Sequence, residues 1–351
     1  MSLFIHAIET AVPEGRISQD DACQMSEELS DADERGRRLI RAVYRNSGIQ
    51  SRSVVGSRET FATGEFGPGT RERMAIYARE APALSLRACV RAMEISNTCA
   101  NDIAHIITVS CTGFMAPGID VHLARNLNIK ANVGRTHIGF MGCPAALNAL
   151  KVADGMAQLA PNSKVLICCV ELCSLHFQHA AEFAIPNALF ADGAAAVIVS
   201  AQPHAERSIG KIAAFESFLL PDSEDVLRWI IGDHGFEMSV TDELPNLIQH
   251  HVRPWMDNLL ARRGMAISDV QSWAVHPGGP RVLTAVRDSL SLSEASLQTS
   301  RAVLSMQGNM SSPTVLFILN QLRAMPSWLP AVVLGFGPGL TMEVGLICDA
   351  H

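Results

Sequence analysis

A cysteine in a helix-start context is the first candidate for chemistry. Cys143 follows Gly142 and precedes Pro144, a residue typical of the first position of a helix. A thiol there lies at the positive end of the helix dipole, beside backbone N–H groups without helical partners, and both favour the nucleophilic thiolate. We therefore predict that Cys143 forms a covalent intermediate; the alternative is that it is simply one buried thiol among nine cysteines.

A histidine and an asparagine could support this nucleophile. His276 ends an apolar run and precedes the rigid turn PGGP (277–280), which would hold its ring at the edge of a cleft. Asn309 lies in GNMSSP, where it could cap a helix or donate its amide N–H groups to an oxyanion. We predict the second role, shared with His276.

The elements that would position these residues belong to an α/β fold. Short runs rich in β-branched residues alternate with helical patterns along most of the chain, which indicates this class. We predict buried strands at 103–110, 163–170, 194–200, 270–276 and 330–336, and a helix at 144–160.

An internal echo suggests that the fold is a duplication. Predicted strands end at Cys111 and at His276, which are 165 residues apart, and helices follow Cys143 and Asn309, which are 166 residues apart. Two nearly equal offsets indicate a repeated βα unit. We therefore expect one pseudo-symmetric fold with halves at 1–205 and 206–351, the first carrying the cysteine and the second the histidine and asparagine.

Composition excludes several other classes. The 351 residues are 48% hydrophobic and 18% charged, so the chain can bury a large core and is not intrinsically disordered. The net charge of -7 gives no basic field for nucleic acid. Nine cysteines without a C-x2-C pair argue against a disulfide framework and against a zinc site.

The sequence shows no targeting signal, and we therefore expect a cytoplasmic protein. The N-terminus lacks a basic start followed by an apolar segment, so we expect no export. The uncharged stretches around 302–322 and 324–342 are interrupted by glycine and proline, so we expect no membrane span.

Four motifs carry a family resemblance. They are IGFMGCPAALNAL around Cys143, WAVHPGGPRVL around His276, QGNMSSPTVLFIL around Asn309, and GFGPGLTMEVGL near the C-terminus. In this order, over nearly the whole chain, they resemble the chalcone synthase-like type III polyketide synthases of the thiolase superfamily. The resemblance implies a homodimer with a thiolase-like αβαβα fold built from two pseudo-repeated halves. It also implies an enzyme that loads an acyl-CoA on cysteine, extends it with malonyl-CoA and cyclises the product, without a carrier protein, metal or other cofactor.

The resemblance also assigns roles to single residues. Cys143 resembles the acyl acceptor, and His276 and Asn309 resemble the pair that promotes malonyl decarboxylation and holds the enolate. Phe190 resembles a gatekeeping phenylalanine, whereas Met238 departs from the aromatic residue frequent at the second gate, which leaves that role open. Further candidates for the product cavity are Ser311 and the cyclisation-pocket loop Gly335, Phe336, Gly337, Pro338 and Gly339.

Basic residues offer contacts for the phosphates of CoA. Arg37, Arg38, Arg41 and Arg45 concentrate in one predicted helix, and Arg281 follows the HPGGP turn. The alternative is that these arginines form an ordinary solvated surface.

The segment VELCSLHF (170–177) indicates which acyl-CoA the enzyme would load as its starter. It resembles bacterial members that accept fatty acyl-CoAs and release alkylpyrones or alkylresorcinols, in which a small side chain at the position of Cys173 leaves room for an acyl tunnel. His176 stands where a small hydroxyl residue is frequent, which would shrink the chamber. We expect a medium- to long-chain aliphatic starter, few extensions and mainly a pyrone; the alternative is a small starter giving a phloroglucinol or naphthalene product.

Three rival classes of protein share parts of this pattern. Papain-like proteases present Cys, His and Asn in this order, but the C-G-[SA]-C-[WY] context is absent around Cys143. A condensing enzyme like ketoacyl synthase III shares the triad but uses a carrier protein; GFGPG, Phe190 and GNMSSP favour the polyketide enzyme. A degenerate thiolase-fold scaffold would have lost a member of the triad, and all three are present.

Overall fold

The computed structural model describes residues 3–64, 66–203 and 208–350, and a nine-stranded sheet runs through both halves of the chain. Its order is β11-β12-β13-β8-β1-β7-β6-β4-β5. The strands of the first half are β1 (Leu3–Ala11), β4 (Ile103–Ser110), β5 (Gly134–Gly139), β6 (Lys164–Leu172) and β7 (Asp192–Ser200). Those of the second half are β8 (Gly210–Leu219), β11 (Ser272–Val275), β12 (Ala331–Gly337) and β13 (Thr341–Cys348).

The strand order confirms the predicted duplication. Leaving the edge strand β5 aside, β4-β6-β7-β1 in one half mirrors β11-β12-β13-β8 in the other. The first pair of each series is parallel and the remaining pairs are antiparallel. The halves meet where β1 and β8 pair over only three residues, Leu3 to Ile5. The boundary predicted between residues 205 and 206 lies outside the described residues and stays a prediction.

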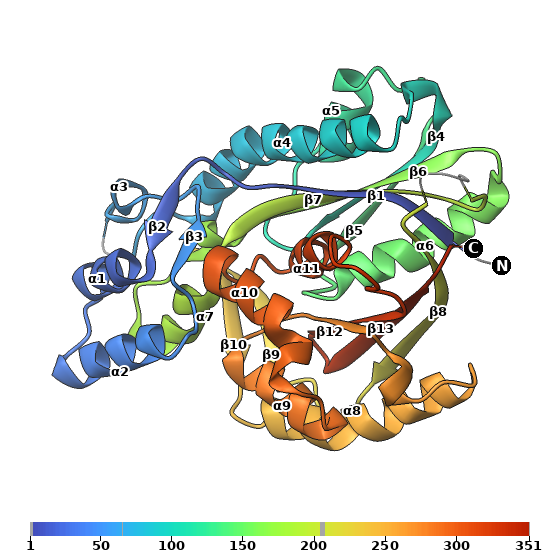
Figure 1. Cartoon of the computed structure of the whole chain (residues 1–351). Coiled ribbons are helices and arrows are strands. Elements are labelled where there is room, and N and C mark those ends of the chain that lie inside the picture. The colour runs from blue at the N-terminus through green and yellow to red at the C-terminus, as the bar shows by residue number, and fades with distance from the viewer. Residues whose placement is uncertain (1–2, 65, 204–207, 351) are drawn as a thin grey trace.

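Helices and the two half-sheets alternate in five layers (Figure 1), which confirms the predicted αβαβα fold. The helices α4 (Thr70–Ile95) and α5 (Ile119–Asn126) cover the outer face of the first half-sheet. The helices α8 (Leu244–Ala261) and α9 (Pro280–Leu290) cover that of the second. Between the sheets lie α6 (Ala145–Leu159) and α11 (Thr314–Leu322), with α10 (Gln298–Gln307) packed against α11.

The central helices have sequences suited to burial on all sides. Alanines at positions 145, 146, 149, 153 and 157 give α6 a slim face against the strands. The sequence TVLFILNQL makes α11 apolar nearly all round, which is typical of a helix enclosed by other elements. The two βα units can therefore bring the starts of their helices together in the middle of the molecule.

Smaller elements flank one end of the layers, at the left of Figure 1. They are α1 (Gln19–Leu29), α2 (Glu34–Arg45), α3 (Arg58–Phe61), α7 (Ala184–Leu189), β2 (Arg16–Ser18) and β3 (Ser51–Ser53). A hairpin of β9 (Leu227–Gly232) and β10 (Gly235–Val240) covers the same end, where β4, β6 and β12 finish.

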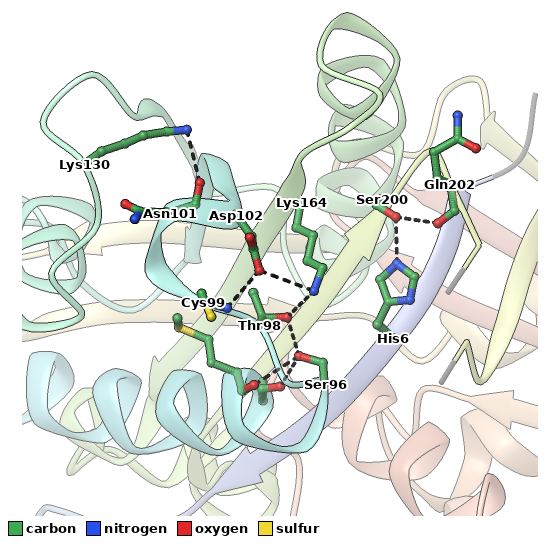
Figure 2. A network of polar contacts seen from close by, with 12 residues as sticks. His6, Ser96, Thr98, Cys99, Asn101, Asp102, Lys130, Lys164, Ser200 and Gln202 are labelled. Carbon is green, nitrogen blue, oxygen red and sulfur yellow. Dashed lines mark hydrogen bonds and ion pairs between the residues drawn. The ribbon is translucent and has the colours of Figure 1, made fainter. Parts of the chain in front are cut away.

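The opposite ends of the strands are tied by a polar network (Figure 2). Lys164 at the start of β6 donates to Thr98 Oγ1 at 2.9 Å and pairs with Asp102 at 3.8 Å. On the neighbouring strands, His6 Nε2 lies 2.7 Å from Ser200 Oγ. These contacts fix the chain after α4 against the sheet, so the two ends of the sheet differ: one is pinned by polar pairs and the other carries cavities.

The predicted elements agree with the structure to within two residues at their ends. The strand at 103–110 is β4, and the helix predicted at 144–160 is α6. Among the described residues no helix is both long and apolar enough to cross a membrane.

Candidate active site

Cys143 lies in a tight turn whose close packing requires glycines, both beside Cys143 and in the neighbouring strand β12. Gly142 has φ +77°, and a Cβ there would lie 2.4 Å from Pro338 Cδ. On the other side, a Cβ at Gly335 or Gly337 would come within 3.0 or 2.8 Å of Pro144. These glycines therefore let β12 pack directly on the turn and hold Cys143 at the start of α6.

The residues 335–339, predicted to form the cyclisation pocket, have two different roles: some line the pockets and others shape the chain. Phe336 and Pro338 line the pockets described below. Gly335 and Gly337 lie in β12 against Pro144, and Gly339 turns the chain with φ +108°.

The side chain of Asn309 is oriented by its own turn. Its backbone N–H donates to Leu189 O, and its carbonyl accepts from Ala191 N–H, both at 2.9 Å. Its side-chain Oδ1 accepts from Ser311 N–H at 2.8 Å. Since the amide oxygen is already engaged, the amide N–H2 group remains available to donate to a bound molecule.

His276 follows β11, as predicted, and its backbone N–H donates to Leu334 O at 2.8 Å. The residue is 1% exposed, and neither ring nitrogen has a hydrogen-bond partner in the described part of the chain. Burial lowers the pKa of His276 to about 3, so the ring is neutral in the empty cavity.

Two adjoining pockets, together called the catalytic cavity, bring these residues together. The first is lined by Cys143, His276 and Asn309, and the second by Cys143 and Ser311. They hold about 470 and about 380 Å³ of empty space, their mouths included. Both also contain Phe190 and Met238, so the predicted gate positions lie beside the triad.

The ionisation of Cys143 differs from our expectation. Burial raises its pKa to about 12, which outweighs hydrogen bonds from Ser311 and Asn309 that lower it. The helix start therefore does not by itself produce a free thiolate. The predicted transfer of the thiol proton to His276, which lines the same pocket, would create both charges together, and their mutual attraction in a cavity of low polarity would reduce the cost of forming them.

Replacing His276 by alanine should consequently shift the ionisation of Cys143. Without the ring the thiolate would stand alone, and burial raises the pKa of a lone buried thiol. We expect the pH midpoint of alkylation of Cys143 by iodoacetamide to rise by about 1 to 3 units, the effect of losing a nearby opposite charge. The exposed His250→Ala is the matched control and should leave the midpoint unchanged. An unchanged or lower midpoint in His276→Ala would refute the pairing.

A buried carboxyl group was missed by the sequence analysis. Glu171, at the end of β6, is 0% exposed and accepts hydrogen bonds from Cys111 N–H, Thr112 Oγ1 and Ser312 Oγ. Burial raises its pKa to about 7, and its negative charge in turn raises the pKa of Cys143. The one available signal was a charged residue at the end of the apolar run SKVLICCV.

Trp229 on the hairpin was missed as well. Its indole N–H donates to Cys111 O at 2.7 Å, and its ring meets Phe190 edge-on at 5.9 Å. Trp229 also lines the catalytic cavity, together with Cys143. A tryptophan in the mixed hairpin sequence LRWIIG gave no indication of this place.

A third pocket, the tail cavity, lies beyond Cys173. It shares Cys173, Trp229, Phe190 and Met238 with the catalytic cavity and holds about 560 Å³ of empty space, its mouth included. Its other walls are mainly apolar and come from β2, α1, α3 and α7 and from the residues next to β3 and α7. They include Ile17, Ala22, Met25, Val54, Phe61, Phe183 and Pro186. The position of Cys173 between two cavities is the one that an acyl tunnel requires.

His176 belongs to the wall of the tail cavity. Its Nε2 lies 2.7 Å from Thr112 O, its Nδ1 accepts from Phe236 N–H at 2.9 Å, and its ring stacks on Phe236 at 4.1 Å. Burial lowers its pKa to about 3. With both nitrogens occupied, this neutral ring fixes the hairpin against the turn after Cys173.

The candidate CoA arginines lie outside these cavities. Arg41 on α2 pairs with Glu27 at 2.6 Å, and Arg281 pairs with Asp242 at 2.8 Å. Arg45 is exposed at the end of α2. The helix α2 that carries Arg41 and Arg45 packs on α7. The catalytic cavity is lined by Val282, which is next to Arg281, and by the α7 residues Ile185, Pro186 and Leu189.

Comparisons with known proteins agree with this geometry. Residues 2–203 match the family model for the N-terminal domain of chalcone and stilbene synthases, and residues 211–350 match the C-terminal one. The chain is 32% identical to 1,3,6,8-tetrahydroxynaphthalene synthase of Streptomyces peucetius subsp. caesius, over 98% of this chain and 92% of that protein. It is also 32% identical to the alpha-pyrone synthesis polyketide synthase-like Pks18 of Mycobacterium tuberculosis, over 98% and 90%.

Solved structures give the same result. PKS-I from the brown alga Ectocarpus siliculosus superimposes with a TM-score of 0.92, 28% identity, and coverage of 99% of this chain and 98% of that one. The C-terminal type III domain of Steely1 from Dictyostelium gives 0.90 and 25%, with full coverage of both chains. The chain therefore belongs to the chalcone and stilbene synthase family and is a type III polyketide synthase, an enzyme that condenses malonyl-CoA with an acyl group by decarboxylation.

Proposed function

We propose that the triad divides the reaction into loading and extension. In loading, His276 takes the proton of Cys143, the sulfur attacks the thioester carbonyl of an acyl-CoA, and CoA leaves as a thiol. In extension, decarboxylation of malonyl-CoA releases CO2 and leaves an enolate, whose oxygen accepts hydrogen bonds from His276 and Asn309. The enolate carbon attacks the acyl-thioester and displaces the sulfur of Cys143.

The buried polar groups in the cavity support these roles. Both ring nitrogens of His276 are buried and have no hydrogen-bond partner among the described residues. The amide N–H2 of Asn309 faces the sulfur of Cys143, whose pKa its hydrogen bond lowers, while Asn309 Oδ1 is held by Ser311 N–H. Such groups can stabilise developing negative charge without reorganisation. We propose that they suffice for the reaction, with no metal or organic cofactor.

We further propose that the starter is a medium- to long-chain fatty acyl-CoA. The single observation that carries this assignment is the tail cavity, which continues from the catalytic cavity past the small side chain of Cys173. Its walls are largely apolar, and burial of alkyl carbons there is favourable by about 0.8 kcal/mol per CH2 group. Small starters would leave this space unused.

The product we propose is mainly a pyrone formed after few extensions. The alkyl chain occupies the tail cavity, so the growing chain must fit beside Trp229, Phe190 and Met238 in the narrow catalytic cavity. Pks18, a similar protein, is named for alpha-pyrone synthesis. The equally similar tetrahydroxynaphthalene synthase makes a naphthalene, so a small starter with a naphthalene or phloroglucinol product is the second candidate.

Arg41, Arg45 and Arg281 are proposed to bind the phosphates of CoA at the cavity mouth. The support is that α2 packs on α7, which lines the pocket containing Cys143, and that Val282, next to Arg281 in α9, lines the same pocket. We also propose that the enzyme works in the cytoplasm, whose reducing conditions suit its nine free thiols.

A homodimer is the proposed assembly. Among the described strands, β5 pairs only with β4, which leaves one edge of the large sheet open. Beside that strand lie Phe114, Phe140 and Met141, with exposed fractions of 52%, 37% and 45%. A second copy would cover both the open edge and this apolar surface.

The test of the starter is Cys173→Phe. A phenylalanine ring at the junction should fill the passage, since a packed wall does not yield to it without a cost of about 1–3 kcal/mol. We expect turnover of lauroyl-CoA to fall at least about tenfold relative to acetyl-CoA, as 1.4 kcal/mol corresponds to a factor of ten. Mass spectrometry of the products with malonyl-CoA as extender gives both rates.

The control is Cys173→Ala, which keeps a small side chain and should preserve the lauroyl preference. Equal turnover of lauroyl- and acetyl-CoA by Cys173→Phe would exclude the tail cavity as the acyl site. If the parent enzyme accepts no fatty acyl-CoA but uses malonyl-CoA alone, the second candidate function is correct.

A further inference from the structure

A buried arginine lies in the wall of the tail cavity, next to the segment that carries Phe190. Arg52 in β3 is 3% exposed, and its Nη1 donates to Phe190 O at 3.0 Å. Its guanidinium group lies over the ring of Tyr44, 5.8 Å from the centroid. Arg52 was not among the residues that the sequence analysis selected.

The carbonyl that Arg52 holds is part of the junction that positions Asn309. Phe190 and Asn309 form an isolated parallel bridge, with hydrogen bonds from Asn309 N–H to Leu189 O and from Ala191 N–H to Asn309 O. Arg52 also contacts the other side of this junction. A Cβ on Gly308 would lie 3.3 Å from Arg52 Cβ, so the arginine stem packs against the residue that precedes Asn309.

No close ion pair in the described part of the chain accounts for this side chain, although the buried carboxylate of Asp192 and the hydroxyl of Tyr44 partly offset the cost of burying its charge. Among the ion pairs of the described residues none includes Arg52, and its Nε has no hydrogen-bond partner there. Burial lowers its pKa, as expected for a cation removed from water. An apolar side chain would fill the same space without desolvating a charge, so the role of Arg52 lies in the carbonyl that it fixes.

We propose that Arg52 is a positioning residue for the extension step: it fixes the Phe190–Asn309 junction and thereby aims the amide of Asn309 at the enolate oxygen. This inference rests on the proposed roles of the triad. Loading depends mainly on Cys143 and His276, which belong to other turns, and the hydrogen bond from Asn309 affects the pKa of Cys143 less than burial does. Arg52 therefore acts chiefly on extension and leaves loading largely intact.

The effect of losing the clamp should be kinetic. Displacing a positioned group by about 1 Å can lower a rate by about 100-fold. In Arg52→Met we expect kcat for malonyl-CoA decarboxylation to fall about 10- to 100-fold, with KM changed less than about threefold. Arg52→Lys retains one charged donor without the planar fork, so its kcat should lie between those of the parent and Arg52→Met.

Acyl loading supplies the internal comparison. The rate at which acetyl-CoA alone adds its acyl mass to Cys143 should stay within about threefold of the parent, because an acetyl group does not reach the tail cavity that Arg52 lines. The matched control is Arg73→Met, which removes another fully buried arginine that donates to Leu175 O and Phe177 O, away from the junction. Arg73→Met should lower the melting temperature as Arg52→Met does, yet keep the parent ratio of decarboxylation to loading.

Hydrogen exchange tests the clamp without activity. In Arg52→Met the amides of Ala191 and Asn309 should exchange at least about tenfold faster than in the parent, whereas those in the middle of β6 should not.

If Arg52→Met does not fold, the pair Arg52→Lys and Arg73→Lys carries the same comparison. Equal losses of decarboxylation and loading, or unchanged exchange at Ala191 and Asn309, would overturn the proposal. A parent enzyme that neither loads acyl groups nor decarboxylates malonyl-CoA would refute the proposed function instead, and the exchange result would still decide the clamp.

Discussion

Replacing Cys143 by serine should abolish product formation while the protein stays folded. A hydroxyl group is a far weaker nucleophile than a thiolate, and the neutral, buried His276 is adapted to accept the proton of a thiol. Removal of a catalytic nucleophile typically lowers kcat by about 10³-fold or more. Because serine is close to cysteine in size and fits the space of Cys143, which is only 7% exposed, the melting temperature should change little.

Mass spectrometry of the intact protein after incubation with acyl-CoA measures this prediction directly. The parent should gain one acyl group on Cys143, and Cys143→Ser should gain none. Cys168→Ser is the matched control, since Cys168 is buried in β6 with its sulfur 3.9 Å from Ser85 O, among apolar residues of α4. It should remain active and lose only modest stability. An acyl adduct on any cysteine other than Cys143 would contradict the assignment.

Much of the fold could be predicted because its signals are local. Runs such as IAHIITVS are too short and too rich in β-branched residues for a buried helix, so β4 was found with its observed limits. The duplication was detectable because both halves keep nearly the same chain length between a strand end and a helix start. The pairing of β1 with β8 could not be predicted, since it rests on three residues whose sequence also suits any buried strand.

The site was harder to predict where its properties come from burial. The position of Cys143 before α6 follows from its neighbours in sequence, but its raised pKa follows from the sheets and the hairpin that enclose it. Glu171 and Trp229 act through contacts with Cys111, which lies 60 and 118 residues away in sequence. Such contacts leave no periodicity or spacing in the sequence.

A second substitution at the nucleophile should separate the two half-reactions. In Cys143→Gln a neutral amide occupies the place of the acyl-thioester, so loading and condensation become impossible. Decarboxylation of malonyl-CoA does not need the thiol. His276 and the amide of Asn309, which Ser311 N–H orients at 2.8 Å, would still stabilise the enolate. We therefore expect Cys143→Gln to convert malonyl-CoA to acetyl-CoA and CO2 without forming polyketide.

On this background each enolate-stabilising donor can be removed singly. Loss of one preorganised oxyanion donor typically lowers a rate by about 10²- to 10³-fold. Both Cys143→Gln/His276→Ala and Cys143→Gln/Asn309→Ala should therefore lose most of the acetyl-CoA release, followed by chromatography of the CoA esters. Cys143→Gln/Cys168→Ser is the control and should retain the rate of Cys143→Gln. If either triad variant keeps that rate, the corresponding side chain does not bind the enolate. For His276 the burial of two ring nitrogens without hydrogen-bond partners among the described residues must then have another cause, because an unpaired buried polar group is destabilising.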